Sequence, residues 1–247
     1  MWKRILLVAA LAIALATLVA PASLMDSLLA NATEGRLRVM HTSGTLWHGK
    51  GLFVSLAADG RSAQPWLSGN WQSEFDPSAA RVAWRLEEAG QIVLRLALEP
   101  RGISITRAAL DTPLRALLDS LPSPIARAGW RGMLRIASEG IDCDWNQDCH
   151  GTAQLTWLDA GVDLLPQQRF GDYEVLARAE GHDGRFEVRT LGGEIRIGGK
   201  GGWSSDGRPY FHGEVSGPEA IVGRLPNVMD GYAFATGDSG RVSIEFD

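Results

Sequence analysis

Short runs in which apolar and polar residues alternate recur along most of this chain, and they constrain its fold more than any other feature. They include RVAWRLEE at 81–88, IVLRLALE at 92–99 and RVSIEF at 241–246. Alternation with a period of two places every second side chain on one face of a β-strand. Many runs follow a glycine, a residue that favours the turns between antiparallel strands. The chain is therefore predicted to be mainly β and antiparallel.

An uncharged apolar segment, residues 5–25, directly follows Lys3 and Arg4. As a helix it would be roughly 31 Å long, enough to cross a hydrocarbon core of about 30 Å. The basic pair predicts a cytoplasmic N-terminus at 1–4, a transmembrane anchor at 5–25 and an exported domain at 26–247. The alternative is a cleaved signal peptide, because Ala20-Pro21-Ala22 has the small residues of a cleavage site.

Two segments break the alternation and have the spacing of short amphipathic helices. In DTPLRALLDSLPSP, Pro113 stands near the first turn and leucines recur every three or four residues. GPEAIVGRLPNVMDG is similar, with Pro218 at its start and Pro226 after the apolar run. A glycine-led strand follows each segment. We therefore expect two short helices and a domain of two similar units, residues 35–121 and 130–247.

Cys143 and Cys149 are the two cysteines of the chain, and they flank the sequence DWNQD. In an exported, oxidising compartment a close pair of this kind favours a disulfide that closes one hairpin. A metal site built from both thiolates and His150 is the alternative. It is disfavoured because zinc ligands prefer a shorter spacing between cysteines and no second Cys or His pair follows.

The segment GTLWHGKG, residues 44–51, places one tryptophan and one histidine among three glycines. Gly44 and Gly49 suit turn positions, where a positive φ is favourable for glycine. Trp47 offers an apolar side chain that would pack this turn against the sheet. We therefore interpret the segment as a corner between two strands, with His48 exposed and not acting as a base.

Signals for catalysis are sparse. The five histidines are isolated and no G-x-S-x-G motif occurs. The glycine-rich segment IRIGGKGGW, residues 195–203, lacks the Lys-Ser/Thr pair of a phosphate loop, and we interpret it as a β-turn. A net charge of −5 argues against nucleic acid as a partner. We therefore expect no enzymatic activity, no catalytic residues, no cofactor and no metal site.

Several glycine and tryptophan landmarks occur together in a distinctive order. They are SGTLWHGKG at 43–51, CHGTAQLTWLDA at 149–160 with Cys143 upstream, LGGEIRIGGKGGW at 191–203 and YFHGEV at 210–215. With the N-terminal apolar segment, this pattern resembles the type II secretion system protein N (GspN) family over most of the chain. The structural landmarks carried by the resemblance include Gly44, Trp47, Gly49 and Trp157.

The resemblance implies a bitopic accessory subunit of the machine that exports folded proteins across the outer membrane. It implies a location in the cell inner membrane, with the β-rich bulk in the periplasm and curved, AsmA-like antiparallel sheets. The implied partners are other inner-membrane and periplasmic subunits of the secretion system, with the outer-membrane secretin as a further candidate. The family supplies no catalytic residues.

An envelope-biogenesis or lipid-handling protein of the AsmA type is the competing interpretation. A wide and continuous apolar groove along the sheet would favour it, whereas a filled core with a polar edge strand would favour the secretion scaffold. Six tryptophans bear on this choice, because they would either line such a groove or pack the core and strand edges. They are Trp66, Trp71, Trp84, Trp130, Trp157 and Trp203.

Overall fold

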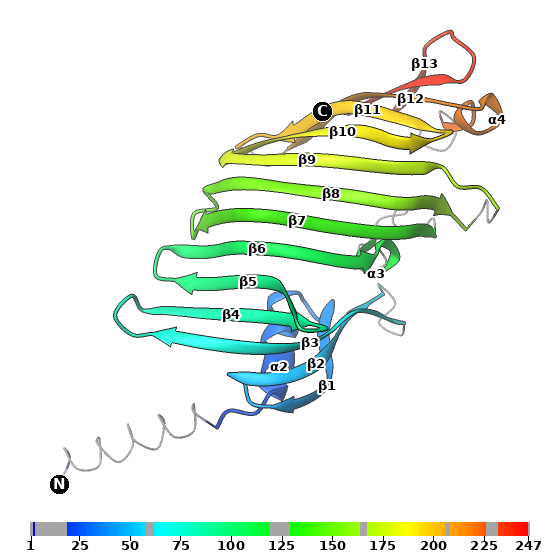
Figure 1. Cartoon of the computed structure of the whole chain (residues 1–247). Coiled ribbons are helices and arrows are strands. Elements are labelled where there is room, and N and C mark those ends of the chain that lie inside the picture. The colour runs from blue at the N-terminus through cyan, green and yellow to red at the C-terminus, as the bar shows by residue number, and fades with distance from the viewer. Residues whose placement is uncertain are drawn as a thin grey trace.

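The computed structural model describes residues 2, 19–57, 62–118, 129–163, 167–205, 208–225 and 232–246. Its described residues form one open sheet of fourteen strands (Figure 1). The strands are β1 (Leu37–Gly44), β2 (His48–Leu56), β3 (Ala63–Asp76), β4 (Arg81–Glu88), β5 (Gln91–Glu99), β6 (Gly102–Pro113), β7 (Trp130–Asp144), β8 (Cys149–Val162), β9 (Gly171–Gly181), β10 (Asp183–Gly193), β11 (Arg196–Trp203), β12 (Pro209–Ser216), β13 (Ala233–Ala235) and β14 (Arg241–Phe246).

The sheet is a simple antiparallel meander. Each strand from β1 to β11 pairs with the next one in the chain, and β14 then lies between β12 and β13. Figure 1 shows the strands stacked in this order, with β1 and β13 at opposite ends. The mainly β, antiparallel prediction is confirmed, but the strands belong to one sheet and not to several.

Three short helices accompany the sheet in the described residues: α2 (Ser23–Ala32), α3 (Leu114–Leu118) and α4 (Glu219–Val222). The two helices expected from the sequence correspond to α3 and α4. Residues Asp111 to Pro113, which we placed at the start of the first one, instead end strand β6. Helix α2 was not predicted, because its first residues belong to the apolar run that we assigned to the anchor.

Within the described residues, every helix is too short or too polar to cross a bilayer. Residues 3–18 of the predicted anchor lie outside the described residues, so the anchor stays a prediction. The end of that prediction, however, needs correction. The backbone N–H of Ala22 donates to the carbonyl of Gly44 at 3.1 Å, and that of Leu46 donates to the carbonyl of Ala20 at 2.8 Å. Residues 20–25 therefore belong to the folded domain.

Buried apolar residues form two separate clusters, one toward each end of the sheet. The first lies under α2 and comprises Ala22, Val39, Leu67, Trp71, Leu86 and Val93. The second lies near α4 and comprises Ile195, Val215, Val222, Ala233 and Val242. Burial of these side chains is the main force that holds a helix onto each end of the sheet.

The glycine-rich segment that we interpreted as a turn is the regular strand β11, and this interpretation was wrong. A Cβ atom on Gly201 would lie 2.6 Å from Cζ of Phe186, and one on Gly199 would lie 2.6 Å from Cζ of Phe211. The rings of Phe186 and Phe211 are themselves stacked, with centroids 5.9 Å apart. The glycines therefore make room for aromatic rings from the two neighbouring strands, which is a known role of glycine in sheets.

The two halves of the chain follow the same order of elements. Strands β1–β6 are followed by α3, and strands β7–β12 are followed by α4. This order is consistent with the two similar units expected at 35–121 and 130–247. The boundary between them falls in residues 119–128, which lie outside the described residues, and the duplication stays a prediction.

Candidate functional site

The corner between β1 and β2 contains both landmark glycines of the first motif. Gly44 has a φ of +91°, a conformation that costs little only for glycine. Gly49 lies directly across from it in the ladder. The backbone N–H of Thr45 donates to the carbonyl of His48 at 2.8 Å and closes the turn. A bridge between Pro21 and Thr45 then ties the N-terminal segment to this corner.

The ring buried under this corner belongs to Trp71 of β3, which is 4% exposed. Its indole N–H lies 3.2 Å from the carbonyl of Thr45 and 3.1 Å from that of Leu46. Trp47 is only half-buried, and its carbonyl accepts a 2.7 Å hydrogen bond from the backbone N–H of Ser73. Trp71 therefore anchors the corner to the core, a role for which we expected Trp47.

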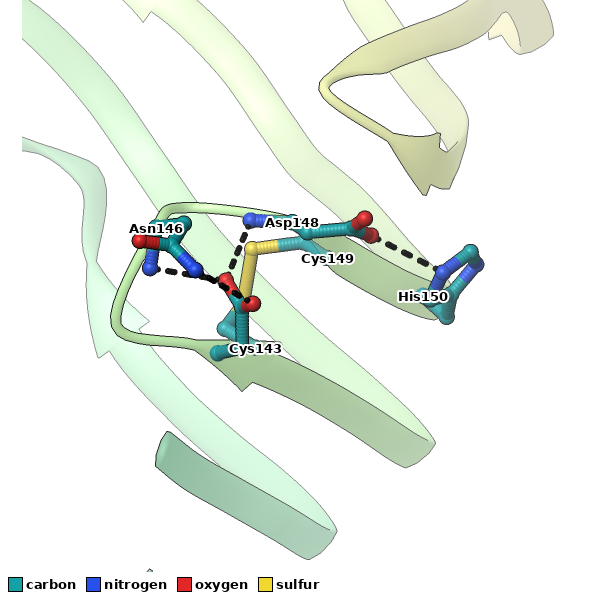
Figure 2. The surroundings of a disulfide bond; sticks show 6 residues. Cys143, Asn146, Asp148, Cys149 and His150 are labelled. Atoms are coloured by element: carbon teal, nitrogen blue, oxygen red, sulfur yellow. Dashed lines mark hydrogen bonds and ion pairs between the residues drawn. A yellow bond between two sulfur atoms is a disulfide. The ribbon is translucent and has the colours of Figure 1, made fainter. Parts of the chain in front are cut away.

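Cys143 and Cys149 form a disulfide, and they face each other across the ladder of β7 and β8 with Cα atoms 4.0 Å apart (Figure 2). The bond closes the hairpin at one end of both strands. Because both sulfurs are in the disulfide, neither is available as a thiolate ligand for the alternative metal site with His150.

Asp144 organises the turn inside this disulfide-closed hairpin. Its Oδ1 accepts hydrogen bonds from the backbone N–H groups of Asp148 at 2.9 Å and Asn146 at 2.8 Å (Figure 2). These bonds, that of Asp148 first, lower the pKa of the Asp144 carboxyl below its usual value. His150 Nε2 lies 2.9 Å from Asp148 Oδ1 and is exposed. The arrangement is a well-satisfied turn with a structural role.

A continuous row of apolar side chains crosses the middle of the sheet on one face. Directly paired residues share a face, and the register of β6 to β10 aligns one apolar residue from each strand. These are Leu110, Ile136, Leu155, Val175 and Val188, called here the central apolar row. At about 4.8 Å per strand the row is roughly 19 Å long. All five side chains are only partly buried.

The central apolar row begins beside the first core cluster and lies between the two clusters. Leu110 packs against the first cluster, whereas Leu155, Val175 and Val188 belong to neither. Among the described elements, α2 packs mainly against β1, α3 against β2, β3, β6 and β7, and α4 against β14. Strands β8 to β10 therefore present partly exposed apolar side chains between two covered ends, and such a surface is a candidate for binding another molecule.

Trp157 lies on the same face as the row, two residues after Leu155 on β8. Its ring contacts those of Trp130 and Tyr173, with centroids 5.5 and 5.6 Å away, and its indole N–H donates to the carbonyl of Arg131 at 2.9 Å. The hydroxyl of Tyr173 donates to the carbonyl of Ile195 at 2.9 Å, and burial raises the pKa of this phenol to about 12. These bonds hold the aromatic side chains in place beside the row.

The opposite face of the same strands is charged. Arg135 and Asp111 form a bidentate ion pair with both N···O distances at 2.9 Å, and Arg135 lowers the pKa of the Asp111 carboxyl. Glu174 is 4% exposed, pairs with Arg189 and accepts a 2.5 Å hydrogen bond from Gln154. One face of the central sheet is thus polar and internally paired, and the other is apolar.

The five histidines give no sign of an active centre. All of them are exposed, and they lie on different parts of the sheet, from His41 on β1 to His212 on β12. Within the described residues, no group of three or more potential metal-ligating side chains occurs.

Sequence reasoning missed the central apolar row as a unit, although each of its residues stands in an alternating run. The row depends on register, which is set by bulges such as those between Ala137 and Gly140 in β7 and between Trp157 and Ala160 in β8. Those bulges have no clear signature in the sequence. The glycine pair Gly49 and Gly51 was a usable signal, because two glycines on one face leave room for a large ring such as Trp71.

A family model for type II secretion system protein N matches residues 35–244. This range begins just before β1 and extends into β14. No curated protein matches the chain, and no solved structure matches it either. Because the family model covers nearly the whole sheet, the chain belongs to the type II secretion system protein N family.

Proposed function

We propose that this chain is a non-enzymatic accessory subunit of the type II secretion system, held in the inner membrane with its sheet in the periplasm. The family match over residues 35–244 carries this proposal. The partly exposed apolar row, the paired charges on the opposite face and the scattered histidines support a binding role over a catalytic one.

The membrane anchor is supported by the way the domain uses the residues that follow it. A signal peptidase that cut after Ala22 would remove Ala20 and Pro21 and would leave a charged terminus at Ser23. The domain would lose the hydrogen bond from Leu46 to Ala20 and the bridge from Pro21 to Thr45. It would also lose Ala22, a core residue that is 2% exposed. Retention of these residues in the fold favours an uncleaved segment.

The topology is tested by fusing a reporter that is active only in the periplasm after Asp247. We expect reporter activity, and we expect the protein to stay in the membrane fraction after a carbonate wash. A soluble mature protein that begins near Ser23 would refute the anchor and restore the signal-peptide alternative.

We propose the central apolar row as the surface that contacts other secretion subunits. A photo-crosslinking residue at Val175 lies in this row, and one at Leu176 lies next to it on the charged face, where the side chain is 42% exposed. We expect Val175 to crosslink to another secretion subunit in intact cells and Leu176 to do so far less. Equal crosslinking from both positions would contradict the assignment.

Lipid handling is the second candidate function, and the gap between the two core clusters favours it. A filled core would have argued against a lipid groove, but strands β8 to β10 present partly exposed Leu155, Val175 and Val188. The same crosslinking experiment separates the candidates. If Val175 yields adducts with phospholipid and none with protein, the lipid-handling function replaces the scaffold.

A further inference from the structure

The folded domain begins immediately after the predicted membrane segment, without a linker. Ala20 and Ala22 are bound to the corner between β1 and β2, so the apolar run available for the bilayer is residues 5–19. As a helix this run would be about 22 Å long, shorter than a hydrocarbon core of about 30 Å. A short span is accommodated by bilayer thinning and by drawing its flanking residues toward the interface. The flanking residues here are those of α2.

Helix α2 has one apolar side directed into the domain and another exposed. Met25 and Leu29 pack against the first core cluster. Leu24 and Leu28, one turn apart on the outer side, are 42% and 54% exposed, and Val19 just before the helix is 71% exposed.

The outer side of α2 also lacks charge. Its other exposed residues are Ser23, Ser27, Asn31 and Ala32, all of them neutral. The single charged residue of the helix, Asp26, is turned toward β1. Its carboxylate accepts hydrogen bonds from Arg38 at 2.6 and 2.7 Å and from the backbone N–H of Val39 at 2.8 Å. An apolar outer side without charge can enter the headgroup region at little electrostatic cost.

We propose that the outer side of α2, with Leu24, Leu28 and Val19, lies in the headgroup region of the membrane that the preceding segment enters. This inference rests on the anchor proposed above. Leu24 and Leu28 follow the end of the span by only five and nine residues. The bilayer interface is therefore the nearest surface that could cover them.

The proposed contact also fixes which end of the sheet faces the membrane. Its β1 end, next to α2, would lie at the membrane, and β13 would be the farthest strand. Thirteen strand spacings of about 4.8 Å separate them, a path of roughly 60 Å. The central apolar row would then be held well away from the bilayer surface, where another subunit can reach it.

The test uses the full chain in phosphatidylethanolamine–phosphatidylglycerol vesicles that contain a lipid-borne quencher. One environment-sensitive fluorophore is attached through Leu28→Cys, and another through Ser239→Cys at the opposite end of the sheet. The native cysteines are bonded to each other and do not react with the label. We expect the label at residue 28 to emit at shorter wavelength and to be quenched about threefold more than the label at residue 239.

Flotation of the protein with the vesicles tests whether the anchor is in the bilayer, independently of the quenching. If the protein floats but the label at residue 28 is quenched no more than that at 239, the contact of α2 is refuted and the anchor survives. If the protein does not float, the anchor and the contact both fail.

A matched pair of double variants tests the leucines themselves, with the label moved to Asn31→Cys. Leu24→Ser with Leu28→Ser should lower quenching at residue 31 about threefold while flotation is retained. The control is Leu176→Ser with Leu191→Ser, which changes two leucines of similar exposure, 42% and 51%, elsewhere on the domain. An equal loss of quenching in both double variants would overturn the proposal.

Discussion

Gly49→Ala tests whether the corner between β1 and β2 is fixed by Trp71. A Cβ atom at residue 49 would lie 2.7 Å from Cε2 of the Trp71 ring and 2.8 Å from the carbonyl oxygen of Thr45. Real Cβ contacts are not this short, so the ring or the turn must move. The ring has little freedom, because it is 4% exposed and its N–H is held by the carbonyls of Thr45 and Leu46.

Two costs contribute to the expected loss. Forcing one extra methyl group into a packed core costs about 1–3 kcal/mol. Displacing the Trp71 indole leaves a buried N–H without its acceptors, which costs about 1–3 kcal/mol. We expect Gly49→Ala to lower the free energy of unfolding by about 3 kcal/mol. For a domain of this size that corresponds to a fall in Tm of about 6–12 °C.

The assay is denaturant and thermal unfolding of the purified protein, followed by circular dichroism. Gly198→Ala is the matched control, because it also lies in a strand and the nearest atom to its Cβ would be the Val188 carbonyl oxygen at 3.9 Å. That substitution should change stability by no more than about 0.5 kcal/mol. If Gly49→Ala is as stable as Gly198→Ala, the reasoning about the Trp71 contact is wrong.

Three further predictions concern charge, the disulfide and the histidines. Arg38 holds the pKa of the Asp26 carboxyl below its ordinary value of 3.8. This ion pair therefore stabilises the domain above about pH 4, and the stabilisation is lost as the pH falls through the lowered pKa. In Asp26→Asn, the free energy of unfolding should fall less steeply between neutral and acid pH than it does in the wild type. The bond between Cys143 and Cys149 should appear as linked peptides in mass spectrometry without reductant, and replacing both cysteines with serine should cost about 2 kcal/mol in urea unfolding. Substituting any one of the five histidines should leave export near wild type at equal abundance, and a histidine variant that is abundant, folded and inactive would reveal an active centre.

The strands with clear alternation were predictable from the sequence. The runs at 81–88 and 241–246 coincide with β4 and β14. Strand β11 was not predictable in this way, because glycine carries no alternating pattern. The rings that fill its glycine positions, Phe186 and Phe211, come from two other strands and are aligned by register. Whether a glycine-rich segment forms a strand can therefore depend more on the side chains of the neighbouring strands than on its own residues.

The N-terminal boundary shows a second limit. Residues 20–25 carry no charge, like the run before them, and the uncharged stretch therefore extends the predicted anchor through Met25. What assigns them to the domain is tertiary contact: Ala22 and Met25 meet the first core cluster, and Asp26 pairs with Arg38 of β1. No local pattern distinguishes an apolar side chain that enters a membrane from one that enters a core.

The candidate site was partly predictable. The spacing of Cys143 and Cys149 identified the hairpin that they close. The glycines of the first motif indicated a corner, but its buried ring is Trp71, which lies 24 residues beyond Trp47. The central apolar row could not be predicted from the sequence, because it forms only when five strands are in register.

Export of a folded substrate, normalised to subunit abundance, tests the central claim most directly. Cells that lack the native copy of the chain receive the wild type, Leu155→Ser in the central apolar row, or Leu176→Ser on the charged face of the neighbouring strand. We predict that wild type and Leu176→Ser restore export, and that Leu155→Ser reduces it at equal abundance. Full export by Leu155→Ser, or undiminished export in cells without the chain, would contradict the account.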